Sequence, residues 1–220
     1  MPTSTVENYV KTLYVERQRT GGDLVALGRL ATAMNVVPGT VTTMVRTLAD
    51  AGLVHYEPRV GVALTAAGET LALHVLRRHR LLEVFLVQVL KFDWSEVHAE
   101  AEELEHAISD KVLEKMDEFL GRPTVDPHGD PIPTADGEIS RPDLLPLTRC
   151  VAGDRVHIAR VENQDSAFLN YANDHGLRPG TEVTVVTADS IAGAITLKHA
   201  DGTTVALGTA AAGVISVKRD

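Results

Sequence analysis

Apolar residues recur at helical spacing through the first quarter of the chain. They occupy positions 6, 9, 10, 13 and 14 ahead of Gly21 and Gly22, which predicts a first helix that ends there. A second helix is predicted over 24–34 and a third over the run 39–52, with Pro38 near its first turn and Gly52 at its C-terminal stop. Two short helices around the connector 35–38 form a helix-turn-helix pattern. Strand-like runs at 53–57 and 62–65 then predict a hairpin, the wing of a winged helix.

The composition of the third predicted helix favours DNA binding over a purely structural three-helix core. Threonine is a poor helix former, yet it recurs on the side of this helix opposite its apolar residues. Hydroxyls and arginines can contact phosphates and base edges, so this face is a candidate reading surface. The candidate DNA-binding residues are Pro38, Thr40, Thr42, Thr43, Arg46 and, at the tip of the wing, Arg59.

The next two predicted helices carry metal-ligating side chains at helical spacing. A helix over 67–89 contains His79 and Glu83, one turn apart, and a helix from residue 95 contains the run 97–106. If that run is helical throughout, four of its ligand-type side chains span an arc of about 100°. These four are His98, Glu102, Glu105 and His106.

Imidazoles and carboxylates without a thiolate favour Mn(II), Fe(II), Co(II) or Zn(II), and the oxygen-rich mixture favours manganese or ferrous iron. A carboxylate-bridged di-iron enzyme is the competing interpretation, because 103–106 matches Glu-x-x-His. That fold needs two such motifs and would leave the helix-turn-helix unexplained, so we expect no enzymatic activity. Solvated, metal-free side chains are the other alternative.

Six of the ten prolines fall between residues 121 and 148, which predicts a linker over 123–148. Beyond it, β-branched runs such as 182–187 and 194–198 alternate with Gly and Asp turns, which indicates a small β-barrel over 149–220. The predicted fold is therefore α+β: a winged helix-turn-helix over 1–70, helices with metal-ligating side chains over 71–122, and a small all-β barrel after the linker.

Charge and composition restrict the class of protein without excluding DNA. The chain carries a net charge of -9, but residues 1–70 hold six basic and six acidic side chains, so the predicted DNA-binding domain has no net charge. Cys150 is the single cysteine, which excludes an internal disulfide and a cysteine-based zinc module. The first ten residues lack the basic start and apolar stretch of a signal peptide, so we expect a cytoplasmic protein with no membrane partner.

The whole chain resembles the diphtheria-toxin-repressor family of metal-dependent transcriptional regulators. The resemblance rests on 7–14 in the first helix, the winged helix, the blocks 77–83 and 98–106, Ser109-Asp110, and Asp126-Pro-His-Gly-Asp-Pro-Ile-Pro133. It implies a homodimer with two metal positions per subunit and a C-terminal SH3-like (FeoA-like) domain. It also implies repression of metal-uptake genes through double-stranded DNA with a palindromic operator.

The resemblance implies the ligands as well. The primary site would comprise Asn8, Glu102, Glu105 and His106, and the ancillary site His79, Glu83 and His98 with Asp165, or its neighbour Gln164, from the SH3-like domain. A second family ligand from that domain falls on Phe168, which cannot coordinate a metal.

Three positions depart from one or other branch of the family. Glu102 stands where iron sensors have Cys, which resembles the manganese-sensing branch, whereas Asn8 supplies a neutral amide where manganese sensors usually have Asp. Lys11 replaces a family-like Glu, which argues against a closely spaced binuclear site. We therefore expect a Mn(II)-dependent repressor. An Fe(II)-responsive repressor, with Co(II) also possible as ligand, and a winged-helix regulator of a non-metal ligand are the alternatives.

Overall fold

The computed structural model of the chain describes residues 3–140 and 142–219, and these divide into two compact units. The first unit comprises Met1–His79, Glu105–Ile108 and Pro133–Ile139, and the second comprises Arg80–Leu104, Ser109–Ile132 and Ser140–Asp220. Helix α4 (Ala66–Gln88) begins in the first unit and continues into the second.

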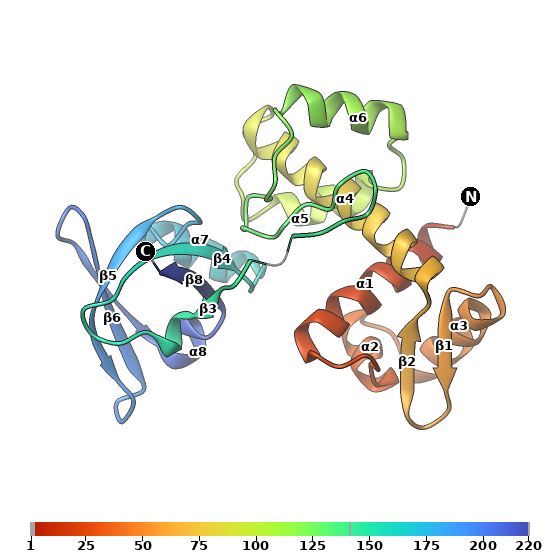
Figure 1. The fold of residues 1–220 in the computed structure, drawn as a ribbon, viewed down its shortest axis with the longest axis horizontal. Coiled ribbons are helices and arrows are strands. Elements are labelled where there is room, and N and C mark those ends of the chain that lie inside the picture. The colour runs from red at the N-terminus through yellow and green to blue at the C-terminus, as the bar shows by residue number, and fades with distance from the viewer. Residues whose placement is uncertain (1–2, 141, 220) are drawn as a thin grey trace. The chain divides into compact units, whose positions relative to one another are not determined.

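The first unit has the element order of a winged helix (Figure 1). Its elements are α1 (Ser4–Thr20), α2 (Leu27–Ala33), α3 (Pro38–Asp50), β1 (Val54–Glu57) and β2 (Gly61–Leu64). The Thr3 side chain caps α1 by accepting a hydrogen bond from the Val6 amide, and Gly21, with φ 68°, ends that helix. The antiparallel hairpin pairs Val54 with Leu64 and Glu57 with Gly61. The predicted helix-turn-helix and wing are confirmed.

The start of the second helix differs from the prediction. Helix α2 begins at Leu27 rather than at residue 24, because Val25 forms an isolated bridge with Val62 of the wing. The two residues exchange both backbone hydrogen bonds, at 2.9 and 3.0 Å. The hairpin therefore joins the helical core through the backbone as well as through its apolar side chains.

The second unit contains the end of α4, α5 (Val97–Leu104) and α6 (Asp110–Phe119). The predicted single helix through 106 is wrong, since α5 ends at Leu104 and Glu105 and His106 lie in the following turn. Glutamates crowd the carboxyl end of α5, where the helix dipole disfavours negative charge. The expected arc of four ligands on one helix face therefore does not form.

Part of the predicted linker is buried structure. The Asp126 carboxylate accepts hydrogen bonds from the amides of His128 and Asp130, and Val125 forms a bridge with Pro131. Asp126 and His128 are 5% and 0% exposed. The prolines here shape a compact turn that a buried carboxylate organises, rather than a solvated spacer.

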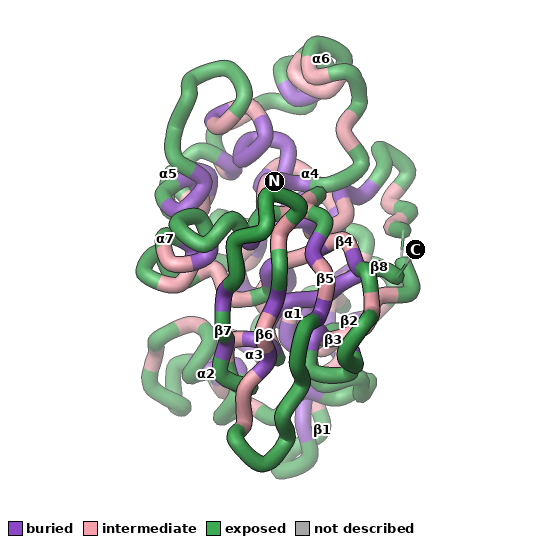
Figure 2. The backbone as a smooth tube through the Cα atoms, turned by 90° about the vertical axis from the view of Figure 1, so that its left-hand side faces the viewer, coloured by how far each residue is buried: buried purple, intermediate pink, exposed green. Residues whose placement is uncertain are grey.

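The C-terminal part is a six-stranded antiparallel sheet in the order β3-β8-β4-β5-β6-β7. Its elements are β3 (Leu145–Pro146), η1 (Leu147–Arg149), β4 (Arg155–Val161), α7 (Ser166–Asp174), β5 (Glu182–Asp189), β6 (Ala194–His199), β7 (Thr204–Gly208), α8 (Thr209–Ala212) and β8 (Ile215–Arg219). Buried and more exposed positions alternate along β6 and β7 (Figure 2). This pattern is typical of a sheet with one face on a core, and it confirms the predicted small β domain. Among the described residues, no helix is long and apolar enough to cross a bilayer.

Candidate metal centre

Helix α1 and the turn after α5 bring together three of the four predicted primary ligands. His106 Nε2 lies 2.7 Å from Asn8 Oδ1 and 3.4 Å from Glu105 Oε1. The other ring nitrogen, Nδ1, lies 2.7 Å from Glu7 Oε2, which orients the imidazole so that Nε2 faces Asn8 and Glu105. An amide oxygen, a carboxylate oxygen and an imidazole nitrogen thus converge.

Glu105 is the most buried member of this group, at 0% exposed. Its two oxygens have different partners: Lys11 Nζ donates to Oε1 at 2.6 Å, and His79 Nδ1 lies 2.7 Å from Oε2. Glu105 was predicted as a primary ligand and His79 as an ancillary one, so the structure joins two residues that the sequence assigned to separate sites.

The fourth predicted primary ligand, Glu102, lies on α5. Its Oε1 is 3.8 Å from His98 Nε2, one turn earlier on the same helix. Ligand atoms of His79, Glu102 and Glu105 can all lie within 4.8 Å of one another, so Glu102 also belongs to a metal-sized cluster.

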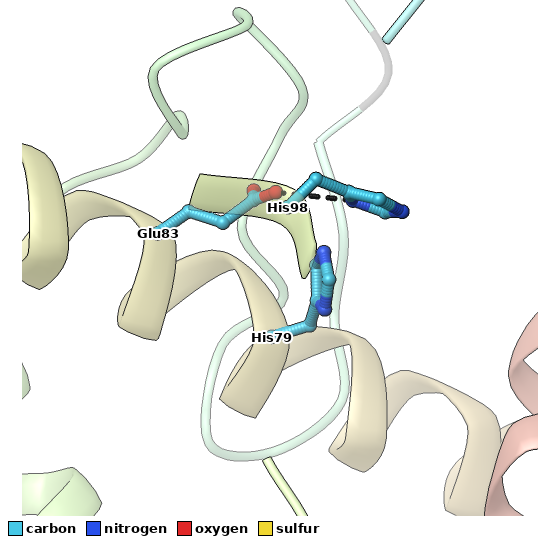
Figure 3. Close-up of side chains that lie close together, drawn as sticks. All are labelled: His79, Glu83 and His98. Carbon is cyan, nitrogen blue, oxygen red and sulfur yellow. Dashed lines mark hydrogen bonds and ion pairs between the residues drawn. The ribbon is translucent and has the colours of Figure 1, made fainter. Parts of the chain in front are cut away.

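A second cluster comprises the predicted ancillary residues His79, Glu83 and His98, whose ligand atoms also lie within 4.8 Å of one another. His79 and Glu83 project from successive turns of α4, and a dashed line marks the 3.3 Å contact between Glu83 Oε1 and His98 Nδ1 (Figure 3). Glu83 is fully buried, whereas the His98 side chain is 42% exposed.

A third cluster, Glu83, Asp126 and His128, is buried throughout and was not predicted as a ligand set. Burial raises the pKa of Asp126 well above its usual value, and the nearby carboxylates of Glu83 and Asp130 raise it further. Burial lowers the pKa of His128, but the Glu83 and Asp126 carboxylates outweigh it and bring the pKa to about 9. The signal in the sequence is the Asp-x-His spacing of 126–128, which contributed only to the family resemblance.

The third cluster fits a cation by its hydrogen bonding. Asp126 Oδ2 and His128 Nδ1 are buried and have no hydrogen-bond partner among the described residues, although Arg80 Nε lies 3.6 Å from Asp126 Oδ2. His128 Nε2 lies 2.9 Å from the Trp94 carbonyl, which leaves Nδ1 as the nitrogen that faces Glu83. Buried polar atoms that lack partners are costly unless something binds them, and oxygen and imidazole donors suit Mn(II) or Fe(II).

The predicted ligands from the SH3-like domain have other partners. Asp165 caps α7, and its Oδ1 accepts hydrogen bonds from the amides of Ala167 and Phe168. Gln164 Nε2 donates to Asp130 Oδ2 at 3.2 Å. None of the three clusters in the described part of the chain includes Asp165.

The candidate DNA surface lies on α3 and the wing. Pro38, Thr40, Thr43, Arg46 and Arg59 are exposed, and Arg59 occupies the tip of the hairpin with φ 68°. The hydroxyls of Thr42 and Thr43 donate to the carbonyls of Pro38 and Gly39, so each must rotate before it donates to DNA.

Comparison with known proteins identifies the class. The N-terminal DNA-binding domain of iron-dependent repressors matches residues 1–62, their metal-binding and dimerisation domain matches 65–134, and the FeoA domain matches 145–219. The chain belongs to this family, that of the diphtheria toxin repressor, and is a metal-dependent transcriptional repressor rather than an enzyme.

Individual relatives support the assignment. The iron-dependent repressor IdeR of Mycobacterium leprae is 30% identical over 196 residues, 84% of each chain. The diphtheria toxin repressor of Corynebacterium diphtheriae is 30% identical over 89% of this chain and 88% of its own. A solved manganese-dependent transcriptional repressor in complex with manganese is 40% identical, with a TM-score of 0.90 over 98% of this chain and all of its own. The predicted family is therefore confirmed, while relatives named for iron and for manganese both occur.

Proposed function

We propose that the protein is a Mn(II)-dependent repressor that acts in the cytoplasm as a homodimer on a palindromic operator of metal-uptake genes. The observation that carries the proposal is the convergence of Asn8 Oδ1, Glu105 Oε1 and His106 Nε2, a set of hard and borderline donors without sulfur. Cys150, the single cysteine, belongs to none of the metal-sized clusters in the described residues.

The proposed primary site consists of Asn8, Glu102, Glu105 and His106. Asn8 belongs to α1, which leads into the DNA-binding domain, while Glu102 lies in the last turn of α5 and the other two ligands follow that helix. A divalent metal, when bound, would supply the positive charge that holds these donors together. A ligand set drawn from both segments favours the arrangement of the DNA-binding domain that fits DNA, and metal binding shifts the population toward it.

The proposed ancillary site consists of His79, Glu83 and His98, with Asp165 or Gln164 as further candidates. Glu83 is shared, because its Oε1 faces His98 while its Oε2 lies 3.8 Å from His128. The Glu83, Asp126 and His128 cluster is therefore the second candidate position for the same ion.

The proposed reading surface consists of Pro38, Thr40, Thr42, Thr43, Arg46 and Arg59. Arginines suit phosphate contacts and threonines suit modest base readout, so shape and backbone contacts should supply much of the affinity. In a homodimer two such surfaces meet two half-sites, which is why we expect a palindromic operator.

The test is fluorescence anisotropy of a labelled palindromic operator, first in chelator and then with Mn(II), anaerobic Fe(II), Co(II) or Zn(II). We expect tight binding that appears only with Mn(II), or with Mn(II) at concentrations where Fe(II) fails, because Glu102 replaces a soft thiolate with a hard oxygen. Binding at the same concentrations with Fe(II) would instead make the protein an iron sensor.

Single substitutions test the assignment of the primary metal site. Glu102→Ala and His106→Ala should each abolish metal-dependent binding while the dimer stays folded, whereas Glu103→Ala, at an exposed neighbouring position, should behave as wild type. A normal metal response in both site variants would refute the primary-site assignment. Equal DNA affinity with and without chelator would point to the alternative, a regulator that senses a non-metal ligand.

A further inference from the structure

We propose that Lys11 is a tethered cation that competes with the metal for Glu105 and thereby sets the metal concentration at which the repressor responds. This inference rests on the proposed function, because it takes Glu105 as a ligand of the primary site.

The geometry places the ammonium on one particular oxygen. Lys11 Nζ lies 2.6 Å from Glu105 Oε1, and the two side chains are 8% and 0% exposed. The same Oε1 lies 3.4 Å from His106 Nε2, whose other neighbour is Asn8 Oδ1 at 2.7 Å. The ammonium therefore occupies the carboxylate oxygen that faces the two other donors.

The opposite oxygen of Glu105 has a different role. Oε2 lies 2.7 Å from His79 Nδ1, a contact that fixes the rotation of the carboxylate. With Oε2 held by His79, Oε1 is the oxygen that remains for a cation, and Lys11 already contacts it. A metal that binds Oε1, Asn8 and His106 must displace the ammonium or share the oxygen with it.

Burial makes this competition strong. A buried carboxylate without a positive partner is costly, so a cation at Glu105 stabilises the folded state whether it is an ammonium or a divalent ion. Lys11 follows Asn8 by three residues on α1, on the same face of the helix, so it stays next to the site at a high effective concentration. A metal ion from solution must therefore displace the Lys11 ammonium from Glu105. If the ammonium stays nearby, its positive charge also repels the metal ion.

Two roles for Lys11 can be separated by experiment. If Lys11 only stabilises the fold, its removal lowers the melting temperature equally with and without metal. If it competes with metal, its removal lowers the melting temperature in chelator and increases the rise that metal produces, because the metal then neutralises a buried carboxylate that has lost its ammonium partner.

The experiment is calorimetric titration of the full-length Lys11→Met protein with Mn(II), paired with thermal melts in chelator and in saturating Mn(II). Methionine keeps an unbranched chain without the charge. We expect the Kd of the primary site to fall at least tenfold, which corresponds to about 1.4 kcal/mol. Lys11→Arg keeps the charge and should keep the wild-type Kd, and Lys198→Met, at an exposed lysine of β6, should leave both Kd and melting unchanged.

The outcomes distinguish this inference from the proposed function. Glu105→Gln identifies the binding step that belongs to the primary site, and if the wild type has no such step, the proposed site itself is wrong. If that step exists but Lys11→Met binds Mn(II) with the wild-type Kd or more weakly, the competition is refuted. Should Lys11→Met not fold in chelator, Lys11→Gln, which retains a hydrogen-bond donor, is titrated instead against the same criterion.

Discussion

Gly129 is the residue whose replacement tests the buried turn most directly. It has φ +88°, and a Cβ built on it would lie 2.0 Å from the Ala159 carbonyl oxygen, where ordinary contact begins at 3.4 Å. The register of β4 against β8 shifts between Ile158 and Arg160, so the carbonyl that approaches Gly129 belongs to a bulge. Gly129→Ala must therefore displace either this strand or the turn that carries His128.

Two effects lower the free energy of unfolding of Gly129→Ala. A left-handed backbone costs a non-glycine residue about 1–2 kcal/mol, and forcing an extra carbon into packed structure costs about 1–3 kcal/mol more. Gly129→Ala should thus lower the free energy of unfolding by roughly 2–5 kcal/mol. Gly153 is the matched control, because it has φ +95° and a Cβ added there would meet nothing within 4 Å. Gly153→Ala should therefore cost only about 1–2 kcal/mol.

The assay is urea unfolding followed by the fluorescence of Trp94, the single tryptophan. Trp94 is 2% exposed and stacks on His128 with ring centroids 5.6 Å apart, so it reports on the unit that contains both glycines. If the two variants lose the same stability within about 0.5 kcal/mol, the steric reasoning is refuted, because only the backbone cost would remain.

Three further predictions concern other parts of the chain. Arg59→Ala should weaken binding to operator and to unrelated DNA by the same factor, and it should reduce the slope of log affinity against log salt concentration by about one, as measured by anisotropy over a salt series. A changed base preference would instead show that the wing contacts bases directly. Cys150 is 3% exposed and burial raises the pKa of its thiol, so iodoacetamide at about pH 8 should label it only after unfolding, and rapid labelling of native protein would contradict this. Leu13→Ala should lower the unfolding free energy by about 2–5 kcal/mol, because Leu13 is 1% exposed, whereas Leu24→Ala, at 44% exposure, should change it by less than about 0.5 kcal/mol in the same denaturation series.

Local sequence signals predicted the helices that carry them. Helix α3 spans Pro38–Asp50, so it begins one residue before the predicted run 39–52 and ends two residues before the predicted stop at Gly52. Helix α4 was predicted over 67–89 and spans Ala66–Gln88, because its apolar spacing continues without interruption. Where a boundary depends on a distant partner, as at Val25 with Val62, local periodicity carries no information about it.

Local periodicity also failed at the candidate metal site, where contacts between distant residues decide the structure. Spacing identified the ligand-type residues, but it placed Glu105 and His106 on a continued α5, whereas contacts with Lys11, Glu7 and Asn8 hold them in a turn. These contacts join residues more than 90 positions apart, so a helical wheel cannot reveal them. The density of prolines likewise predicted a linker, but part of this segment is a turn organised by the buried carboxylate of Asp126. A count of prolines does not distinguish a solvated chain from a hydrogen-bonded turn.

The charges around Glu105 restrict how the protein can achieve a selective response. Asn8 is neutral and Lys11 is positive, so two positions on one face of α1 reduce the negative charge available to a cation. Affinity for every divalent ion falls together when charge is removed, so charge alone cannot favour manganese over iron. Selectivity must then come from donor type, which is where Glu102 in place of a thiolate matters. A sensor with hard donors and a tethered competitor would respond only when its metal is abundant, as the proposed repression of metal-uptake genes requires.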